Sequence, residues 1–287
     1  MSLWGTAIAT ILFALLFLLE RVFPLRHPNR PLLPRLLSNT GMVILALAVN
    51  VTVVQTAFHV THQWTVTHSI GLMQVTPLPD ALKFILAFLL MDLTFYYWHR
   101  ANHFFPLLWR FHNAHHIDPD LDVSTAFRFH VGEMLFSAGF RALQVAIIGV
   151  SLSTYLIYEA VYQAIVLFQH SNLQLPLWLE RRLNWVLVTP RMHGIHHSQI
   201  QQETNSNWSL IFPWWDRLNG TLRLNIPQSD IKIGVPAYTQ PEDNQLWNIL
   251  LLPFRAQRDY WQDHRHRKVP EEVATEVSDP TWMVGNL

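Results

Sequence analysis

The sequence predicts an all-α fold: a multi-pass membrane helical bundle with a histidine-rich helical cap. Half of the residues are hydrophobic and only 14% are charged. The apolar residues form blocks long enough to cross the ~30 Å hydrocarbon core of a bilayer as helices. Sixteen histidines and no cysteine leave imidazole as the strongest metal ligand of the chain. The formal net charge of zero gives no support to nucleic-acid binding, which would need a basic excess.

Three single membrane spans are predicted over residues 3–19, 41–60 and 81–98. The first begins without charge and is followed by Glu20-Arg21, so we interpret it as a retained helix and not as a cleaved signal peptide. The connection after it carries arginines, whereas the connection 61–80 carries no lysine or arginine. The positive-inside rule then places the first connection, and the end of the third span, in the cytoplasm. The arginines are Arg21, Arg26, Arg30 and Arg35.

Residues 134–169 are apolar over nearly twice the length of one span, and a turn at 149–151 divides them into a predicted hairpin of two helices. Arg141 and Glu159 each lie nine residues from Val150, which puts them at equal depth in the two arms. An unpaired arginine inside a membrane costs ~2.5–3.5 kcal/mol on insertion scales. We therefore expect an ion pair between Arg141 and Glu159.

The histidines are grouped at three places that this topology brings to the cytoplasmic face. One i, i+4 pair follows the third span, and two H-x-x-H-H motifs occur in "FHNAHHI" and "MHGIHHS". On a helix the three histidines of such a motif share one side, while the two adjacent ones diverge by ~100° and can address different ions. Eight imidazoles exceed the three or four that a single zinc ion takes. The pattern predicts two metal ions, with iron, zinc, copper and nickel all compatible with imidazole. The eight are His99, His103, His112, His115, His116, His193, His196 and His197.

Asp92 and Tyr96 precede His99 on the same helical stripe. We expect Asp92 to accept the second ring N–H of a ligand histidine or its neighbour, which would fix the tautomer of the ligand. The other histidines are interpreted as ordinary core or surface residues; they are His27, His59, His62, His68, His264 and His266.

At these motifs the chain resembles the fatty acid hydroxylase and sterol desaturase superfamily of membrane di-iron oxygenases. The resemblance covers about residues 81–224 and rests on "DLTFYYWHRANH", "FPLLWRFHNAHH", "TAFRFHVGE", "FQHSN", "TPRMHGIHH" and "NSNWSLIFPWWDRLNGTL", in this order. It implies two iron ions bound by the eight histidines above, with His170 as a ninth ligand. His130 is either a further ligand or a residue that supports one. Acidic groups are expected around the uncompensated charge of the ions, namely Asp92, Glu133 and Asp216, with Asp118, Asp120 and Asp122 as either supporting groups or a solvated loop.

The resemblance further implies that O2 is activated to attack an unactivated C–H bond of a lipid, giving hydroxylation or desaturation. The substrate stays open among a sterol or hopanoid-like ring, a fatty acyl chain, a sphingoid base, an alkylglycerol ether and a carotenoid. The reaction needs two external electrons, and the chain has neither a Gly-rich dinucleotide fingerprint nor a cytochrome b5-like segment. A separate reductase, ferredoxin or cytochrome b5-like donor is therefore expected. The alternatives are a metal-binding or metal-transporting membrane protein without redox catalysis, and a non-catalytic relative that holds zinc.

The chain divides into N-terminal spans and loops (1–80), a catalytic region (81–224) and a C-terminal cytoplasmic tail (225–287). Residues 175–188 predict an interfacial helix, with donor docking as the alternative use of Arg181 and Arg182. In the tail, 244–254 is expected to lie on the membrane, 255–268 to form a polar helix, and the remainder to be poorly ordered. Since no targeting segment is evident, a bacterial inner membrane is favoured over the endoplasmic reticulum.

Overall fold

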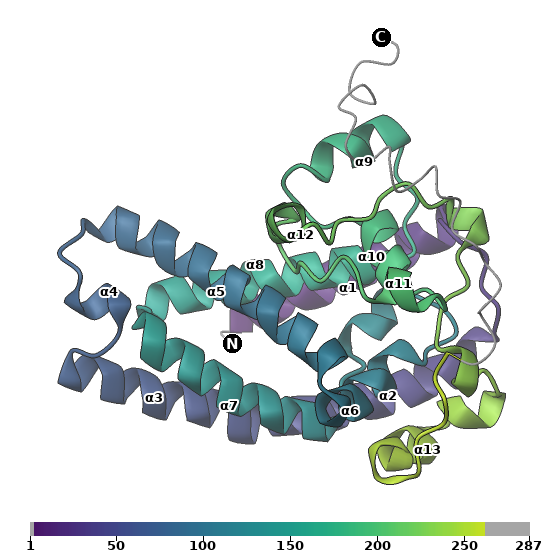
Figure 1. Cartoon of the computed structure of the whole chain (residues 1–287), viewed down its shortest axis with the longest axis horizontal. Coiled ribbons are helices and arrows are strands. Elements are labelled where there is room, and N and C mark those ends of the chain that lie inside the picture. Colours follow the sequence, from purple (N-terminus) through teal and green to yellow (C-terminus); the bar gives the residue numbers. More distant parts are fainter. Residues whose placement is uncertain (1–2, 262–287) are drawn as a thin grey trace.

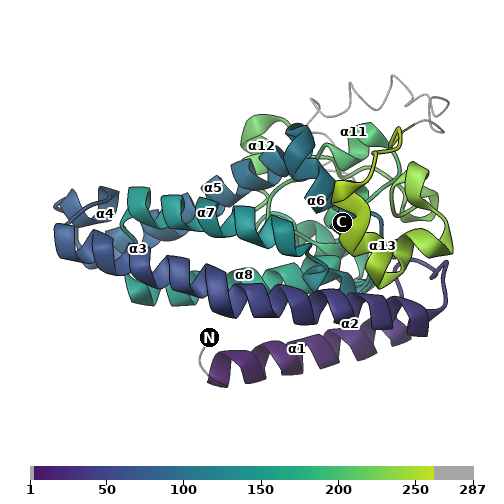
Figure 2. The same ribbon diagram turned by 90° about the horizontal axis from the view of Figure 1, so that it is seen from below.

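The computed structural model describes residues 3–261, in which long helices run side by side and the shorter ones, except α4, gather towards one end (Figures 1 and 2). Within these residues the chain forms helices and no β-strand, which confirms the all-α prediction. The long helices are α1 (Leu3–Val22), α2 (Leu32–Val49), α3 (Gln55–His68), α5 (Asp80–Phe104), α7 (Val131–Ile148) and α8 (Leu152–His170). The short helices are α4 (Leu72–Val75), α6 (Pro106–His116), α9 (Leu177–Leu183), α10 (Pro190–His196), α11 (Gln201–Thr204), α12 (Trp214–Asn219) and α13 (Leu246–Leu251).

Three helical stretches of the described chain are long and apolar enough to cross a membrane: Leu32–Val75, Asp80–Phe104 and Val131–Ile148. The predicted spans 41–60 and 81–98 lie within the first two, and the third is the first arm of the predicted hairpin. Many large apolar side chains on these helices are exposed, as expected of a surface that faces lipid. The prediction of a membrane helical bundle is therefore confirmed.

The second predicted span is part of a much longer helix than the sequence indicated. α2, a π-helical segment (Asn50–Val54) and α3 run without interruption from Leu32 to His68. At 1.5 Å per residue this helix is ~55 Å long and exceeds the ~30 Å hydrocarbon core. Polar residues after position 60 lower the hydropathy but do not break the helix. The chain turns only at Ser69, which has a left-handed φ of 53°, and at Gly71, where φ is 104°.

The predicted hairpin is present, with α7 and α8 joined at Gly149 in the left-handed conformation (φ 68°). A Cβ added at Gly71 would lie 2.4 Å from the Cα of Gly149. The two turns are therefore too close together for any side chain at position 71. Within the hairpin Arg141 forms an ion pair with Glu159, and its guanidinium also lies 4.6 Å from the centre of the Phe95 ring. The pair therefore joins both arms of the hairpin to α5.

Arg141→Met and Glu159→Gln are each expected to destabilise the protein strongly. The double variant should lose less stability than the sum of the two single effects. Each single change leaves an unpaired charge inside the bundle, while the double change removes both. A double-mutant cycle on unfolding in detergent should give a coupling energy of about 1–3 kcal/mol. Additive effects of the two changes would contradict a contribution of the pair to stability.

The first connection, between α1 and α2, lies at the same end of the bundle as the histidine segments. Its arginines are held by acids just beyond α6: Arg35 donates to Asp118 at 2.7 Å and to Asp122 at 2.9 Å, and the backbone of Arg30 donates to Asp120. These three acids are buried, so they are not a solvated loop. Burial alone would raise the pKa of Asp118, but Arg35 and Arg128 outweigh it and hold this pKa at about 2.

The segments predicted to lie on the membrane surface are shorter than expected. The interfacial helix predicted over 175–188 is limited to α9, on which the side chain of Trp178 is 60% exposed. In the tail, α13 and the turn after it expose Trp247 and Phe254. A polar helix was predicted over 255–268, but residues 255–261 are not helical. The rest of that prediction and the expected disorder beyond it lie outside the described residues.

Candidate metal centre

Nine buried or half-buried histidines meet in two groups at the cap end of the bundle. In each group one ring nitrogen per residue lies within 4.8 Å of all the others. The first group comes from α5, α6 and α10 and consists of His99, His103, His112, His116 and His196. The second comes from α6, from the last residue of α8 and from α10 with the residue after it, and consists of His115, His170, His193 and His197.

Each H-x-x-H-H motif is divided between the two groups. His115 and His116 are adjacent in α6 but belong to different groups, as do His196 and His197 at the end of α10. The ~100° step between neighbouring helical residues explains this division. The rings of His116 and His197 stack across the boundary with centres 4.4 Å apart, so the two groups form one continuous cage.

The Nε2 atoms in the second group converge on one another, as they would around a shared cation. The Nε2 atom of His170 lies 3.1 Å from that of His115 and 2.9 Å from that of His193. In the first group, the Nε2 atoms of His112 and His196 are buried and have no hydrogen-bond partner in the described chain. Leaving buried ring nitrogens without a partner is costly unless a metal ion binds them. The donor set therefore fits two imidazole-bound metal ions.

Four of the nine rings are oriented by an acceptor on their other nitrogen. The Nδ1–H groups of His99, His196 and His170 donate to the backbone carbonyls of Trp208, Ser206 and Val166 at 2.8–2.9 Å. The Nδ1–H of His112 donates to Glu133 at 2.8 Å. An acceptor at Nδ1 fixes the proton there and leaves the Nε2 lone pair for a metal ion.

Burial keeps the imidazoles in the neutral form that metal binding needs. It lowers the pKa of His196 to about 3 and moves the pKa values of His115, His116, His193 and His197 well below the ordinary value. The neighbouring histidines add to this shift, since two protonated rings in contact would repel each other. At neutral pH the cage therefore offers uncharged nitrogen donors.

Of the acids predicted to support the ligands, only Glu133 contacts one. Asp92 does not reach a histidine; it accepts hydrogen bonds from the backbone N–H groups of Ile211 and Phe212 and from the indole of Trp215. Asp216 accepts from the backbone of Trp208 and Ser209, and the hydroxyl of Tyr96 pairs with that of Thr221. The partners of Asp92 lie in the segment 211–215 and not among the histidines, so the expectation for Asp92 was wrong. Asp92 and Asp216 instead hold the loop whose carbonyls orient His99 and His196.

His130 lies outside both groups. Its Nδ1 accepts from the backbone N–H of Gly132 and caps the start of α7, while its Nε2 lies 3.0 Å from the carbonyl of Leu250. Both ring nitrogens thus have partners, which favours a structural role over that of a tenth ligand.

The residue types of Ser206 and Trp208 do not indicate that their backbone carbonyls accept hydrogen bonds from the histidine rings. These carbonyls are positioned by Asn207 between them, which adopts a left-handed φ of 55°. Its side chain donates to the carbonyls of Met192 and Arg223 and accepts from the backbone N–H of Arg223. Asparagine tolerates this conformation better than most residues, and the "NSNW" motif could have indicated it.

Glu133→Gln is expected to weaken metal binding about 10- to 100-fold without unfolding the protein, because the carboxylate that orients His112 is lost. Dialysis against a graded series of chelator concentrations, followed by metal analysis, measures this change. Glu242→Gln, the same exchange at an exposed acid that belongs to neither histidine group, is the matched control. Unchanged metal retention in Glu133→Gln would contradict an orienting role.

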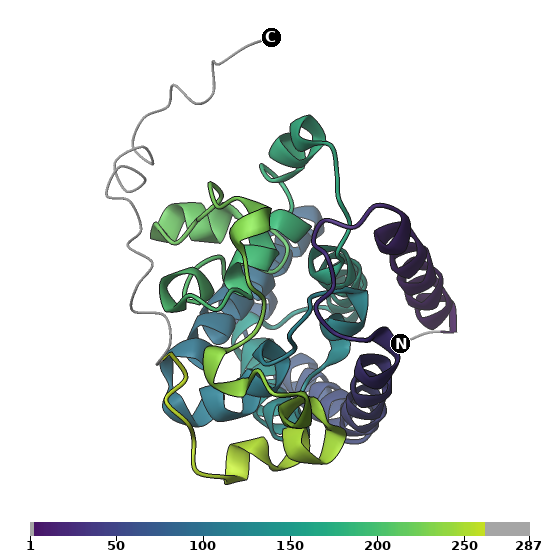
Figure 3. The same cartoon turned by 90° about the vertical axis from the view of Figure 1, so that its right-hand side faces the viewer.

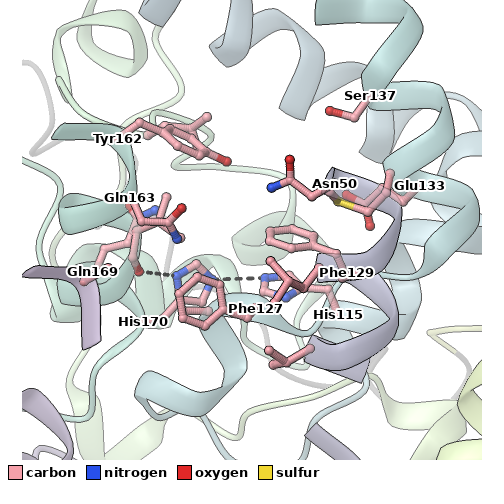
Figure 4. Close-up of a pocket in the computed structure, with 18 of the residues that line it drawn as sticks. Asn50, His115, Phe127, Phe129, Glu133, Ser137, Tyr162, Gln163, Gln169 and His170 are labelled. Atoms are coloured by element: carbon pink, nitrogen blue, oxygen red, sulfur yellow. Dashed lines mark hydrogen bonds between the residues drawn. The ribbon is translucent and has the colours of Figure 1, made fainter. Parts of the chain in front are cut away.

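A cavity of about 490 Å³ extends from this cage into the helix bundle. His99, His112, His115, His170 and His193 line one end of it, so both groups of histidines face the same space. Its walls come from α1, α2, α5, α7 and α8 and are mostly apolar. Figure 4 shows His115 and His170 beside Phe127 and Phe129, with Asn50, Gln163 and Tyr162 further along the cavity.

Residues 84–221 match the fatty acid hydroxylase family. Among curated relatives, the chain is 31% identical to an ornithine lipid hydroxylase of Rhizobium tropici over 55% of its own length and 46% of the relative's. It is 30% identical to an alkylglycerol monooxygenase of Danio rerio, over 73% and 44% of the two lengths. It is 33% identical to the human cholesterol 25-hydroxylase, over 47% and 49%. The chain thus spans less than half the length of these relatives, and no solved structure matches it significantly.

Proposed function

Because residues 84–221 belong to the fatty acid hydroxylase family, we propose that the protein is a membrane-bound di-iron enzyme that hydroxylates a lipid with O2 and two external electrons. The observation that carries this proposal is the opening of both histidine groups into one cavity. A carbon atom at that end of the cavity would meet both ions at once. The relatives are named as hydroxylases and monooxygenases of lipids, so we favour hydroxylation over desaturation.

The nine histidines would hold the iron, and bound iron would supply the activation of O2. The remaining residues position the ligands and exclude water. The backbone carbonyls of Ser206 and Trp208 and the carboxylate of Glu133 fix three rings before any metal binds. The aromatic side chains of Phe95, Trp98, Phe127 and Phe129 line the cavity next to the cage and keep this end apolar. A preorganised, water-poor site protects a reactive oxidant from side reactions.

The substrate would enter between α1 and α2. Thr10 on α1 and both Thr40 and Leu47 on α2 line the cavity and are at the same time exposed on the surface of the bundle. In Figure 3 the two N-terminal helices lie at the right edge of the bundle, with most of the remaining helices to their left. An opening at this edge faces the hydrocarbon core when the bundle is in a membrane. A lipid could therefore reach the histidines from within the bilayer.

We place the electron donor, a reductase, ferredoxin or cytochrome b5-like protein, at a second cleft of about 300 Å³. This cleft shares no lining residue with the cavity and reaches His103, a half-buried member of the first group. Trp109 packs 4.9 Å from the His103 ring, and Arg110 offers a positive charge to an acidic partner. The cleft, the histidines and the arginine-rich first connection share one end of the bundle, which we place in the cytoplasm of a bacterial cell.

A metal transporter is not favoured. Transport sites lie near the membrane midplane with access to both sides, whereas these ligands form a buried cage at one end of the bundle, fixed by hydrogen bonds. A non-catalytic relative that holds zinc would keep the same cage.

Metal analysis and O2 consumption test the proposal and its rivals together. Protein purified without oxygen is expected to contain two iron ions per chain and to consume O2 when reductant and membrane lipid extract are added. Comparative lipid mass spectrometry of cells with and without the gene should then show a product heavier by one oxygen atom. Stoichiometric zinc, or iron without lipid-dependent O2 consumption, would contradict the proposed function.

A further inference from the structure

The cavity contains more polar groups than an alkyl chain requires. Besides the histidines, it is lined by Asn50, Ser137, Tyr162, Gln163 and Gln169, several of which point into it in Figure 4. In the described chain, the hydroxyls of Ser137 and Tyr162 and the amide of Gln163 have no hydrogen-bond partner within the protein. These residues belong to helices that cross the interior of the bundle, where water is scarce and an unsatisfied polar group is costly.

Two further amides point to an occupant more directly. The side chain of Gln169 is fully buried, and neither its oxygen nor its nitrogen has a partner. The side chain of Asn102 is 2% exposed, and its oxygen is also unpartnered. Both residues line the cavity. Buried amides are almost always hydrogen-bonded in proteins, so these two require a bound molecule.

Asn50 is presented by the π-helical segment described above. The extra residue per turn in such segments changes the direction of a side chain, and they are frequent at functional sites. The side-chain oxygen of Asn50 accepts from Gln55 at 3.3 Å, which leaves its NH2 group as a donor for the cavity. The helix is thus distorted at the point where it contributes a polar group to an apolar wall.

The polar groups lie at two depths, because Gln169 and Asn102 directly precede His170 and His103, whereas Gln163 lies further along α8. Gln163 is seven residues before His170 on α8, a rise of about 10 Å along the helix. The charged residues at this depth do not need a ligand, because Arg141 and Glu159 neutralise each other. The free groups are therefore neutral donors and acceptors, and their natural partner is a neutral one.

We infer that the cavity binds a lipid with a neutral hydrogen-bonding group, a hydroxyl or an amide, which Asn50 and Gln163 hold about 10 Å along α8 from the histidines. This inference rests on the proposed function and narrows its substrate class. A purely hydrocarbon chain would leave these amides unsatisfied. The bound polar group fixes the depth of the lipid, and with it the carbon that faces the cage.

Dodecan-1-ol and dodecane, which differ only in one hydroxyl, test this inference with protein in lipid nanodiscs. The concentration dependence of the melting temperature gives an apparent Kd for each. The alcohol is expected to bind about tenfold more tightly, the effect of about one good hydrogen bond. The double change Asn50→Leu and Gln163→Leu should abolish this preference, while Thr52→Val, on the same π-helical segment but not lining the cavity, should keep it.

Metal content separates the two proposals. Preference for the alcohol in protein that binds no iron would leave the inference standing and contradict the proposed function. Equal binding of both probes by the unaltered protein, with two irons present, would overturn the inference and assign the polar groups to water. Persistence of the preference in the double variant would overturn the roles of Asn50 and Gln163. If the double variant fails to fold, Gln163→Met alone must reduce the preference.

Discussion

Removing two histidines from either group is expected to cost the protein one metal ion and its lipid product. His116→Ala with His196→Ala reduces the first group from five ligands to three, and His170→Ala with His193→Ala reduces the second from four to two. Changes outside the ligand shell already lower metal affinity or activity 10- to 100-fold, so the loss of two ligands should lower product formation by at least about 100-fold. Metal analysis should find about one ion per chain in each double variant.

The matched control is the pair His59→Ala and His62→Ala. These two residues have the i, i+3 spacing that also occurs within each H-x-x-H-H motif. They lie in α3, however, and belong to neither group. The control should keep both ions and full product formation. His130→Ala should also keep both ions, since both of its ring nitrogens have other partners. A first-group or second-group double variant that retained two ions would contradict the two-ion cage.

Asp118→Asn is expected to be among the most destabilising single substitutions, by about 3–5 kcal/mol. Arg35 donates to both oxygens of Asp118, and the guanidinium of Arg128 lies 3.7 Å away, with all three side chains at most 5% exposed. An asparagine leaves these buried cations without their main counter-charge. The melting temperature and the free energy of unfolding in detergent measure the effect.

The loss should spread to the metal centre, because Asp118 follows His115 by three residues and His116 by two. We expect Asp118→Asn to lose iron on gel filtration under conditions where the unaltered protein keeps it. Adding Arg35→Met should recover part of the stability, since it removes the uncompensated charge. Asp259→Asn, an exposed acid in the region after the histidine motifs, is the control and should change little. Equal stability of Asp118→Asn and this control would contradict the role of the buried network.

Much of this architecture could be predicted from simple periodicities. Hydropathy located the spans at 41–60 and 81–98 and the first arm of the hairpin, and Gly149 located the hairpin turn, because span length and turn chemistry are local properties. The spacing of H-x-x-H-H indicated which side chains share a helix face. The arginines of the first connection lie at the same end of the bundle as the histidines, as predicted. Their role is not limited to setting the orientation of the chain in the membrane. Arg35 is buried in ion pairs with the segment after α6.

What could not be predicted depends on contacts between distant segments. The carbonyls that orient His99 and His196 belong to Trp208 and Ser206, and a backbone group has no residue type to reveal it. Asp92 was assigned to a histidine because the two lie on one helical stripe, yet its partners lie more than 115 positions further on. The extension of the second helix beyond the predicted span 41–60, back to Leu32 and on to His68, was missed because hydropathy marks where lipid ends, not where a helix ends.

The opening between α1 and α2 has a consequence for the kinetics of the proposed enzyme. A substrate that arrives sideways through the bilayer never has to dissolve in water, so its aqueous concentration does not set the rate. Turnover would follow the mole fraction of substrate among the surrounding lipids. Diluting the substrate with inert phospholipid at constant total amount would slow the reaction, whereas diluting the whole suspension with buffer would not.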